Sequence, residues 1–120
     1  MRRVIIESPF AGATPELAAR NLRYLRACLH DCLQRGEAPF ASHSLYTQEG
    51  VLRDDDVNER ALGIKAGFAW RAAAHATVVY EDLGVSHGMR MGIEDAKELL
   101  FRGSPPHEIE YRSLGGEWKP

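Results

Sequence analysis

The sequence predicts one α/β domain, residues 1–120, with three layers and a doubly wound parallel sheet of about four to five strands in the order 2-1-3-4. Two observations lead to this fold class. Short apolar runs alternate with longer segments of helical periodicity, which is the pattern of parallel βαβ units. The length of 120 residues, with 44% hydrophobic and 27% charged residues, is ordinary for one globular domain.

The first βα unit is predicted from strong local signals. The apolar run Arg3–Glu7 reads as a buried strand, and Ser8–Gly12 reads as the turn that ends it. Thr14 offers a side-chain cap, and Pro15 suits the first position of the helix that follows. Gly36 is expected to end this helix.

The second unit begins with a short strand over residues 38–42, whose proline favours a sheet edge or a strand start. A long loop is expected over residues 43–55. Asp56 and Glu59 then resemble a capping box for a helix over residues 57–73. The apolar positions of this helix recur at helical spacing and are expected to be its buried stripe: Ala61, Ile64, Phe68 and Ala72.

The third unit contains the clearest strand, residues 76–80, which is apolar and β-branched and therefore expected at the centre of the sheet. A polar loop over residues 81–88 follows. A helix is predicted over residues 89–101, and a last strand over residues 108–112. Residues 115–120 are assigned to no element.

Composition excludes several classes of function. The net charge of −2 gives no basic surface of the kind that nucleic-acid-binding proteins carry. No signal peptide or membrane span is found, so a cytoplasmic protein is expected. No metal-ligand spacing, dinucleotide-binding loop or phosphate-binding loop occurs, and no metal or cofactor is expected. Cys28 and Cys32 fall on the apolar stripe of the first helix and are interpreted as core side chains.

The topology places the binding site at the carboxyl ends of the strands. A phosphate or similar anion is expected between residues 8–14 and 86–90, because two helix amino ends offer free N–H groups there and an arginine can pair with the anion. The alternative is that Ser86 only caps a helix and Gly12 only forms a turn. The candidate ligand-binding residues are Glu7, Ser8, Pro9, Phe10, Gly12, His43, Ser86, His87, Gly88, Met89 and Arg90.

Carboxylates near these strand ends are the candidate catalytic residues: Glu81, Asp82 and Glu94, with Glu7 close by. Paired acids can hold ribose hydroxyls, or act as nucleophile and general acid at a glycosidic carbon. The alternative is that they are solvated loop ends and that Glu94 forms a helix-surface ion pair with Arg90.

Several segments resemble one family. Residues 5–12 resemble the opening strand and turn of nucleoside 2-deoxyribosyltransferase-like proteins, and residues 84–94 resemble their third-loop motif. Residues 38–43 and 88–94 resemble an uncharacterised bacterial and phage branch of that superfamily, DUF4406/DUF7768-like. The resemblance implies a flavodoxin-like or Rossmann-like fold, homo-oligomers, and a glutamate that attacks the anomeric carbon of a nucleoside or nucleotide.

The sequence departs from this family where the chemistry occurs. Aligning Gly88 with the motif glycine places Gly92 where the nucleophilic glutamate belongs, and Ile5 where a tyrosine is usual. Glu94 lies two positions later, roughly 200° around the helix axis. Two functions therefore stay open: a nucleoside or nucleotide N-glycosidase or deoxyribosyltransferase, and a catalytically inactive nucleotide-binding module that senses or sequesters its ligand. A purely structural role is a third.

Large apolar side chains predict self-association. Phe68, Trp70 and Phe101 are expected at an interface of a homodimer or larger homo-oligomer, since a small monomer seldom exposes such side chains in one patch. The alternative is that all three complete the core of the monomer.

Overall fold

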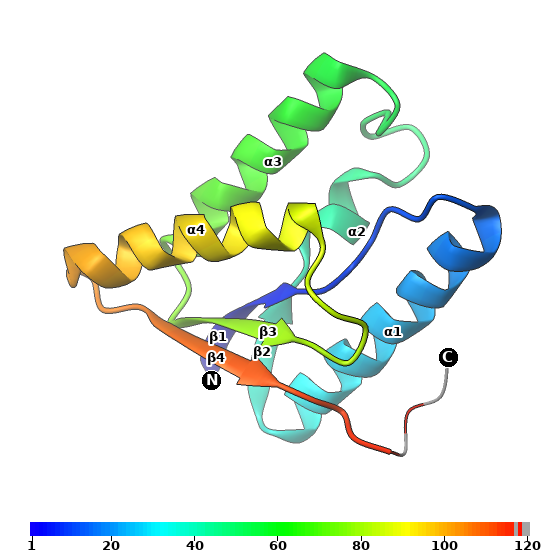
Figure 1. Ribbon diagram of the computed structural model, residues 1–120. Helices are drawn as coiled ribbons and strands as arrows, with labels where there is room; N and C mark the ends of the chain where they lie inside the picture. The colour runs from blue at the N-terminus through cyan, green and yellow to red at the C-terminus, as the bar shows by residue number, and fades with distance from the viewer. Residues whose placement is uncertain (117, 119–120) are drawn as a thin grey trace.

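A computed structural model describes residues 1–116 and residue 118 of the chain. Its four strands form one parallel sheet in the order β2-β1-β3-β4, with helices on both faces (Figure 1). The predicted three-layer α/β fold and strand order are therefore confirmed. The elements are β1 (Arg2–Glu7), α1 (Pro15–Gln34), β2 (Glu37–Phe40), α2 (Ser42–Tyr46), α3 (Val57–Arg71), β3 (Ala76–Tyr80), α4 (His87–Arg102) and β4 (Glu108–Arg112).

The main core lies between the sheet and α1. Side chains alternate along a strand, so every second residue of β1 and β3 points to this face. These residues pack against buried side chains of α1 that include both cysteines, which are free thiols, as the sequence predicts. The cluster consists of Val4, Ile6, Ala76, Val78 and Tyr80 from the strands, Tyr24, Leu25, Cys28 and Cys32 from α1, and Ala41.

The opposite face of the sheet is covered mainly by α4. Val79 packs there against Met89 and Ile93. Helix α3 contacts α2 and α4 rather than lying flat on the sheet, and it leans away from α4 in Figure 1. The expected buried stripe of α3 is therefore wrong: Ala61 and Ala72 are exposed.

The buried positions of α3 are instead Gly67 and Arg71, near its carboxyl end. Ile64 and Phe68 are half-buried. Periodicity alone identifies an apolar face of a helix but not the surface on which that face packs. This difference in packing leaves room for a cleft.

Helix ends follow the predicted caps closely. The Thr14 side chain accepts a hydrogen bond from a backbone N–H of α1, and the Asp56 side chain accepts two from α3. Glu59 does not complete the expected capping box, because its carboxylate accepts instead from the backbone N–H of Arg53. Ser86 caps α4, which begins at His87, two residues earlier than predicted. The short helix α2 begins at Ser42, which was predicted as the end of the second strand, and it continues into the segment predicted as a loop.

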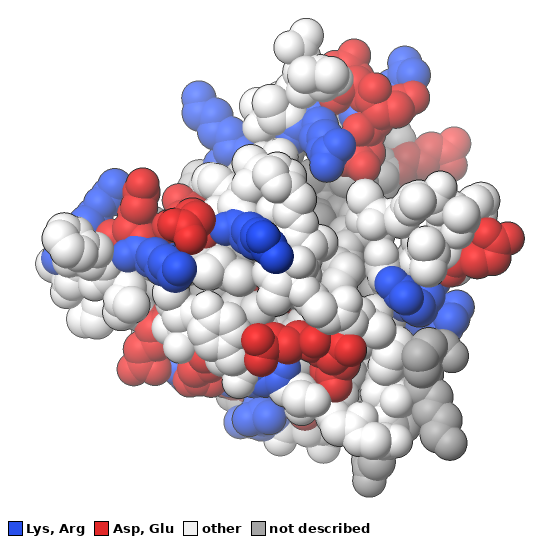
Figure 2. All heavy atoms as spheres, in the orientation of Figure 1, with Lys and Arg blue, Asp and Glu red and all other residues white. Residues whose placement is uncertain are grey.

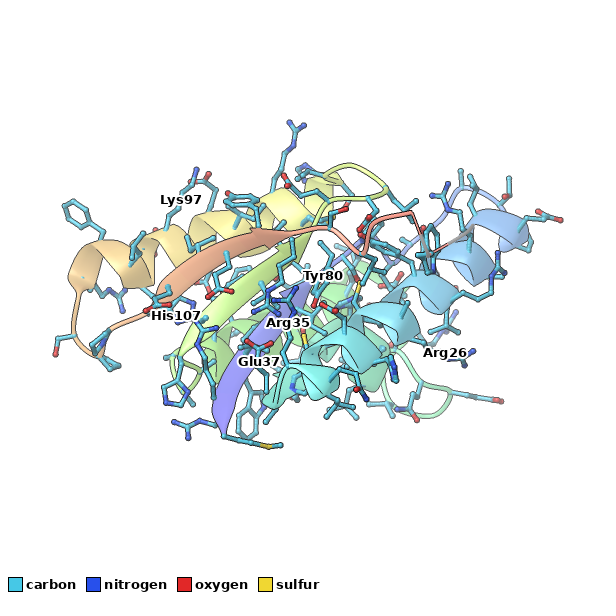
Figure 3. The ribbon with its side chains drawn as sticks, turned by 90° about the horizontal axis from the view of Figure 1, so that it is seen from below. Arg26, Arg35, Glu37, Tyr80, Lys97 and His107 are labelled. Atoms are coloured by element: carbon cyan, nitrogen blue, oxygen red, sulfur yellow. The ribbon has the colours of Figure 1, made fainter. Side chains whose placement is uncertain are left out.

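A network of ion pairs joins three strands on the face that carries α1. Arg112 of β4 donates from both terminal nitrogens to the Glu37 carboxylate of β2, each at 2.7 Å. Arg2 of β1 contacts the same carboxylate at 3.1 Å and Glu110 at 2.7 Å. Figure 3 views this face and shows Glu37 beside α1, close to Tyr80. Hydrogen bonds from Arg112 hold the pKa of Glu37 below its usual value, which favours the ionised carboxylate. The ion pair of Glu37 and Arg112 therefore connects the two edge strands, β2 and β4.

Candidate functional site

A cleft of about 330 Å³ opens at the carboxyl ends of the strands. Its walls are the loop after β1, α2 with the segment that follows, α3, and the amino end of α4. Figure 2 shows the hollow between these elements. Its volume lies in the range of small-molecule sites, and its position agrees with the strand-end rule for open parallel sheets.

Three acidic residues line the cleft, Glu7, Asp54 and Glu59, and of these Glu7 is the last residue of β1. Its side chain is 13% exposed, and Oε2 accepts a hydrogen bond from Nη2 of Arg71 at 2.7 Å. No described group donates to Oε1, and Oε1 is not among the fully enclosed atoms that lack a partner. One carboxylate oxygen is therefore fixed by an arginine while the other stays open to the cleft.

Arg71 is itself held on every nitrogen. Nε donates to Asp95 of α4 at 2.9 Å, and Nη1 donates to the Thr77 hydroxyl of β3 at 2.9 Å. The side chain is 3% exposed, so this cation lies beneath the cleft with its charge balanced by Glu7 and Asp95. The arrangement ties β1, β3, α3 and α4 together at the floor of the site.

Burial raises the pKa of Glu7, and the attraction of Arg71 opposes this without cancelling it. The negative charge of Asp95 adds to the upward shift. A carboxyl with a raised pKa exchanges protons closer to neutral pH than an exposed one does. This property suits a group that acts on a ligand by charge or proton transfer.

Gly92 faces this carboxylate from the first turns of α4. A Cβ atom at position 92 would collide with both oxygens and with Cδ of Glu7. A side chain of any kind at this position is therefore incompatible with the observed place of the Glu7 carboxylate. Where the family resemblance expects a glutamate on α4, the cleft contains a glutamate that comes from β1.

One wall pairs a serine with a histidine. The Ser8 hydroxyl lies 3.4 Å from Nε2 of His43, and the His43 ring makes an edge contact with Phe10 at 5.0 Å between ring centroids. Burial lowers the pKa of His43 to about 4, so its ring is neutral at pH 7. A neutral imidazole offers a donor on one nitrogen and an acceptor on the other.

Another part of the lining is apolar, and the sequence did not predict it. It comes from α3, from α2 and from the segment between them: Tyr46, Leu52, Ile64 and Phe68. Arg53 and Arg60 also line the cleft, and both are exposed. One sequence signal for this wall is the helical spacing of Ile64, Phe68 and Arg71, which places the three side chains on one face of α3. An arginine at the end of such an apolar face indicates that a polar surface lies beside it.

The structure brings most of the predicted ligand-binding residues into the cleft: Glu7, Ser8, Phe10, His43, Ser86, His87, Gly88 and Met89. Three do not line it. Pro9 is buried, and Arg90 is exposed on α4. Gly12 packs against the first turn of α1, where a Cβ would be too close to the backbone, so the close approach that it permits is to its own chain.

The three predicted catalytic carboxylates lie outside the cleft. Glu81 is exposed beyond the end of β3. Asp82 points to the α1 face, where its carboxylate accepts from the Tyr24 hydroxyl at 2.6 Å and from the backbone N–H of Leu114. Glu94 is exposed and pairs with Lys97 at 3.3 Å rather than with Arg90. Spacing along the chain could not reveal this, because side-chain direction depends on how each strand ends.

Asp82 anchors the segment that follows β4. Its carboxylate also accepts from the Ser113 hydroxyl at 2.7 Å and from the backbone N–H of Gly115 at 3.3 Å. Burial acts to raise the pKa of Asp82, but these hydrogen bonds together hold it below its usual value. Its contacts are those of a structural anchor.

Among the described residues, no helix is long and apolar enough to span a bilayer, and no cluster of three metal-ligating side chains is present.

Comparison with known proteins adds two findings. The family model described as Domain of unknown function (DUF7768) matches residues 2–103. A solved 2-deoxyribosyltransferase from the psychrotolerant bacterium Bacillus psychrosaccharolyticus superposes with a TM-score of 0.62 over 98% of this chain and 77% of that one, at 14% identity. At this identity the likeness shows the fold. No curated protein matches the sequence.

Proposed function

The chain belongs to the family Domain of unknown function (DUF7768), and we propose that it binds a nucleoside or nucleotide in its cleft and breaks the N-glycosidic bond with Glu7 as the reacting carboxylate. The nucleoside part of the proposal draws on the fold shared with a 2-deoxyribosyltransferase. The assignment of Glu7 draws on the geometry of the cleft.

One observation supports this assignment above the others: the carboxylate of Glu7 fills the space directly over Gly92. The family resemblance expects a nucleophilic carboxylate to project from position 92. A carboxylate in the same part of the cleft can meet the same anomeric carbon, whichever element of the fold supplies it.

The chemistry requires only groups of this site and water. The Oε1 atom of ionised Glu7 attacks the anomeric carbon as the bond to the base breaks, and the base leaves with the bonding electron pair and takes up a proton from the solvent. Water then attacks the same carbon and returns a proton to the solvent, which releases the sugar and restores the carboxylate. In a transfer reaction, a second base takes the place of water.

The walls of the cleft suit the two halves of such a ligand. The apolar side chains of Tyr46, Ile64 and Phe68 can cover the faces of a base, since aromatic and aliphatic surfaces bind planar rings by burial and stacking. The polar end around Glu7 and Ser8 can face the sugar hydroxyls, because carboxylate and hydroxyl oxygens accept hydrogen bonds from them.

A binding module without catalysis is the second candidate. The observation that favours it is the same glycine, since Gly92 removes the carboxylate from the place where the resemblance expects it. Glu7 would then orient a ligand by hydrogen bonding and form no covalent bond.

Incubation of the purified chain with a panel of nucleosides, 2′-deoxynucleosides and 5′-monophosphates tests the proposal, with free base quantified by chromatography. Glu7→Gln is nearly isosteric and is expected to reduce base release by at least about a hundredfold, the range seen when a reacting group is lost. Glu94→Gln is the matched control, because it removes an exposed carboxylate outside the cleft and should retain full activity.

Binding of the same compounds is measured by calorimetry. If a compound binds but no base is released, the result supports the second candidate, a binding module without catalysis. Base release that survives Glu7→Gln but is lost in Glu94→Gln would contradict the assignment of Glu7.

A further inference from the structure

Arg71 combines deep burial with contacts to three different elements. Its guanidinium reaches Glu7 of β1, Thr77 of β3 and Asp95 of α4, with distances of 2.7, 2.9 and 2.9 Å. It comes from the last turn of α3, the part of that helix that is buried. A long, flexible side chain with every nitrogen engaged has one available geometry, so its position is determined by its partners.

The hydrogen bonds behind Arg71 have a defined direction. Nη1 donates to the Thr77 hydroxyl oxygen, so the hydroxyl hydrogen is left to donate to Nε2 of His107, 2.8 Å away. The imidazole then carries its hydrogen on Nδ1, which faces the carbonyl oxygen of Ala74 at 3.2 Å. The chain of donors therefore runs from the arginine through the threonine and histidine to the backbone, and it leaves no ambiguity in the orientation of Arg71.

We propose that Arg71 is a positioning residue for Glu7: it holds Oε2 and leaves Oε1 directed to the ligand, while Asp95, Thr77 and His107 hold the guanidinium in place. The inference rests on the proposed role of Glu7 as the reacting carboxylate. It assigns to α3 and α4 a shared task, because the Arg71–Asp95 pair joins the two helices that flank the cleft.

The charges around Glu7 separate a positioning role from a merely structural one. The cation of Arg71 favours the ionised carboxylate, whereas the anion of Asp95 disfavours it. The other titratable side chains that line the cleft are His43, Tyr46, Arg53, Asp54, Glu59, Arg60 and His87. His43 lies beside Ser8, and His107 lies behind Thr77. Removing Arg71 or Asp95 should therefore shift the titration of Glu7 in opposite directions, although both changes break the same ion pair.

The experiment uses the full chain in two variants, Arg71→Gln and Asp95→Asn, with Arg71→Lys as the conservative replacement. The Glu7 carboxyl is titrated by carbon-13 NMR, and its signal is assigned by its loss in Glu7→Gln. We expect the Glu7 pKa to rise by about one unit or more in Arg71→Gln, to fall in Asp95→Asn, and to return toward the wild-type value in Arg71→Lys.

The same variants are compared by the pH profile of base release. Its acid limb should follow the Glu7 pKa, upward in Arg71→Gln and downward in Asp95→Asn. At saturating substrate, kcat should fall about tenfold or more in Arg71→Gln, with a smaller change in KM, because misdirection of Oε1 affects the reacting geometry more than binding.

The outcomes are distinct. A Glu7 titration that is the same in all variants, or that moves in the same direction in both charge variants, overturns the positioning role. If Arg71→Gln does not fold, the downward shift in Asp95→Asn decides the question alone. If the titrations move as expected but the wild type releases no base, Arg71 still positions the carboxylate and the proposed reaction is the part that fails.

Discussion

At the scale of single residues, the cleft is shaped by the contact between Glu7 and Gly92. The carboxylate needs the space that a side chain at position 92 would occupy. A glycine is therefore needed at position 92, because the Glu7 side chain at the end of β1 lies against the backbone of α4 there. The resemblance to a family with a glutamate on this helix turn does not predict that contact.

Gly92→Ala tests this contact. The added methyl group collides with Glu7, so the free energy of unfolding should fall by about 1–3 kcal/mol, the usual cost of overpacking. In the background of Glu7→Ala the same change should cost much less, because the colliding carboxylate is gone. Urea unfolding of the four proteins of this double-mutant cycle measures the coupling. Additive effects would show that the two residues are not in contact.

At the scale of elements, the amino end of α4 has two possible tasks. Ser86 caps the helix by accepting from the backbone N–H of Met89 at 3.3 Å, and it also lines the cleft. Its hydroxyl can therefore stabilise the helix, bind an anionic ligand, or do both. Arg90 is exposed on α4 and does not line the cleft, whereas the exposed cations Arg53 and Arg60 do.

Ser86→Asp separates the two tasks. Aspartate caps helices about as well as serine, so the stability of the protein should be retained, whereas Ser86→Ala should lose about 1 kcal/mol. If a ligand phosphate lies at this helix end, the added negative charge should weaken binding of a 5′-monophosphate about tenfold more than binding of its nucleoside. Calorimetry with both ligands gives the comparison. Equal effects on the two would place the phosphate elsewhere.

At the scale of the whole molecule, the half-buried His43 and the buried His107 make the free energy of unfolding depend on pH. Burial lowers the pKa of His43 to about 4, below the value of about 6.5 in an unfolded chain. Below pH 6.5 the unfolded state binds more protons than the folded state does. The free energy of unfolding therefore has its full value, as far as His43 is concerned, above about pH 6.5, and it falls as the pH is lowered toward 4. The pKa of His107 is lowered by burial as well, and it acts in the same direction.

The free energy of unfolding should therefore fall between pH 7 and pH 4.5, by about 2–3 kcal/mol for His43 alone. Urea unfolding at several pH values measures this slope. His43→Gln keeps a polar side chain that does not titrate, so it should flatten the slope by that amount. An unchanged slope in the variant would show that His43 is not held neutral by the fold.

Self-association stays a prediction. Trp70 is 53% exposed and Phe101 is 93% exposed, so the two side chains do not complete the core of the monomer. Phe68 is half-buried at the cleft and contributes less to the outer surface. Light scattering at micromolar concentration should give the mass of a dimer or larger species, and Trp70→Glu should lower that mass by placing a charge in the interface. A monomer mass for the wild type would contradict the prediction.

The sequence by itself determined the order and type of most elements. The residues that begin or end helices act within a few positions of their own place in the chain, as Thr14, Pro15, Gly36 and Asp56 do. They can therefore be recognised without knowledge of the fold. Strands that alternate with helices also required a parallel sheet, and the strand-end rule then located the cleft. The short helix α2 was missed because its five residues carry no periodic pattern.

Only the tertiary structure decided which side chains meet. Glu7 and Asp82 both lie at the ends of neighbouring strands, yet one points into the cleft beside Arg71 and the other anchors residues 113–115 on the opposite face. The apolar face of α3 lines a cavity because the helix packs on α2 and α4 instead of on the sheet. Such choices depend on contacts between residues far apart in the chain, and the balance of packing and desolvation that selects them is a property of the whole fold.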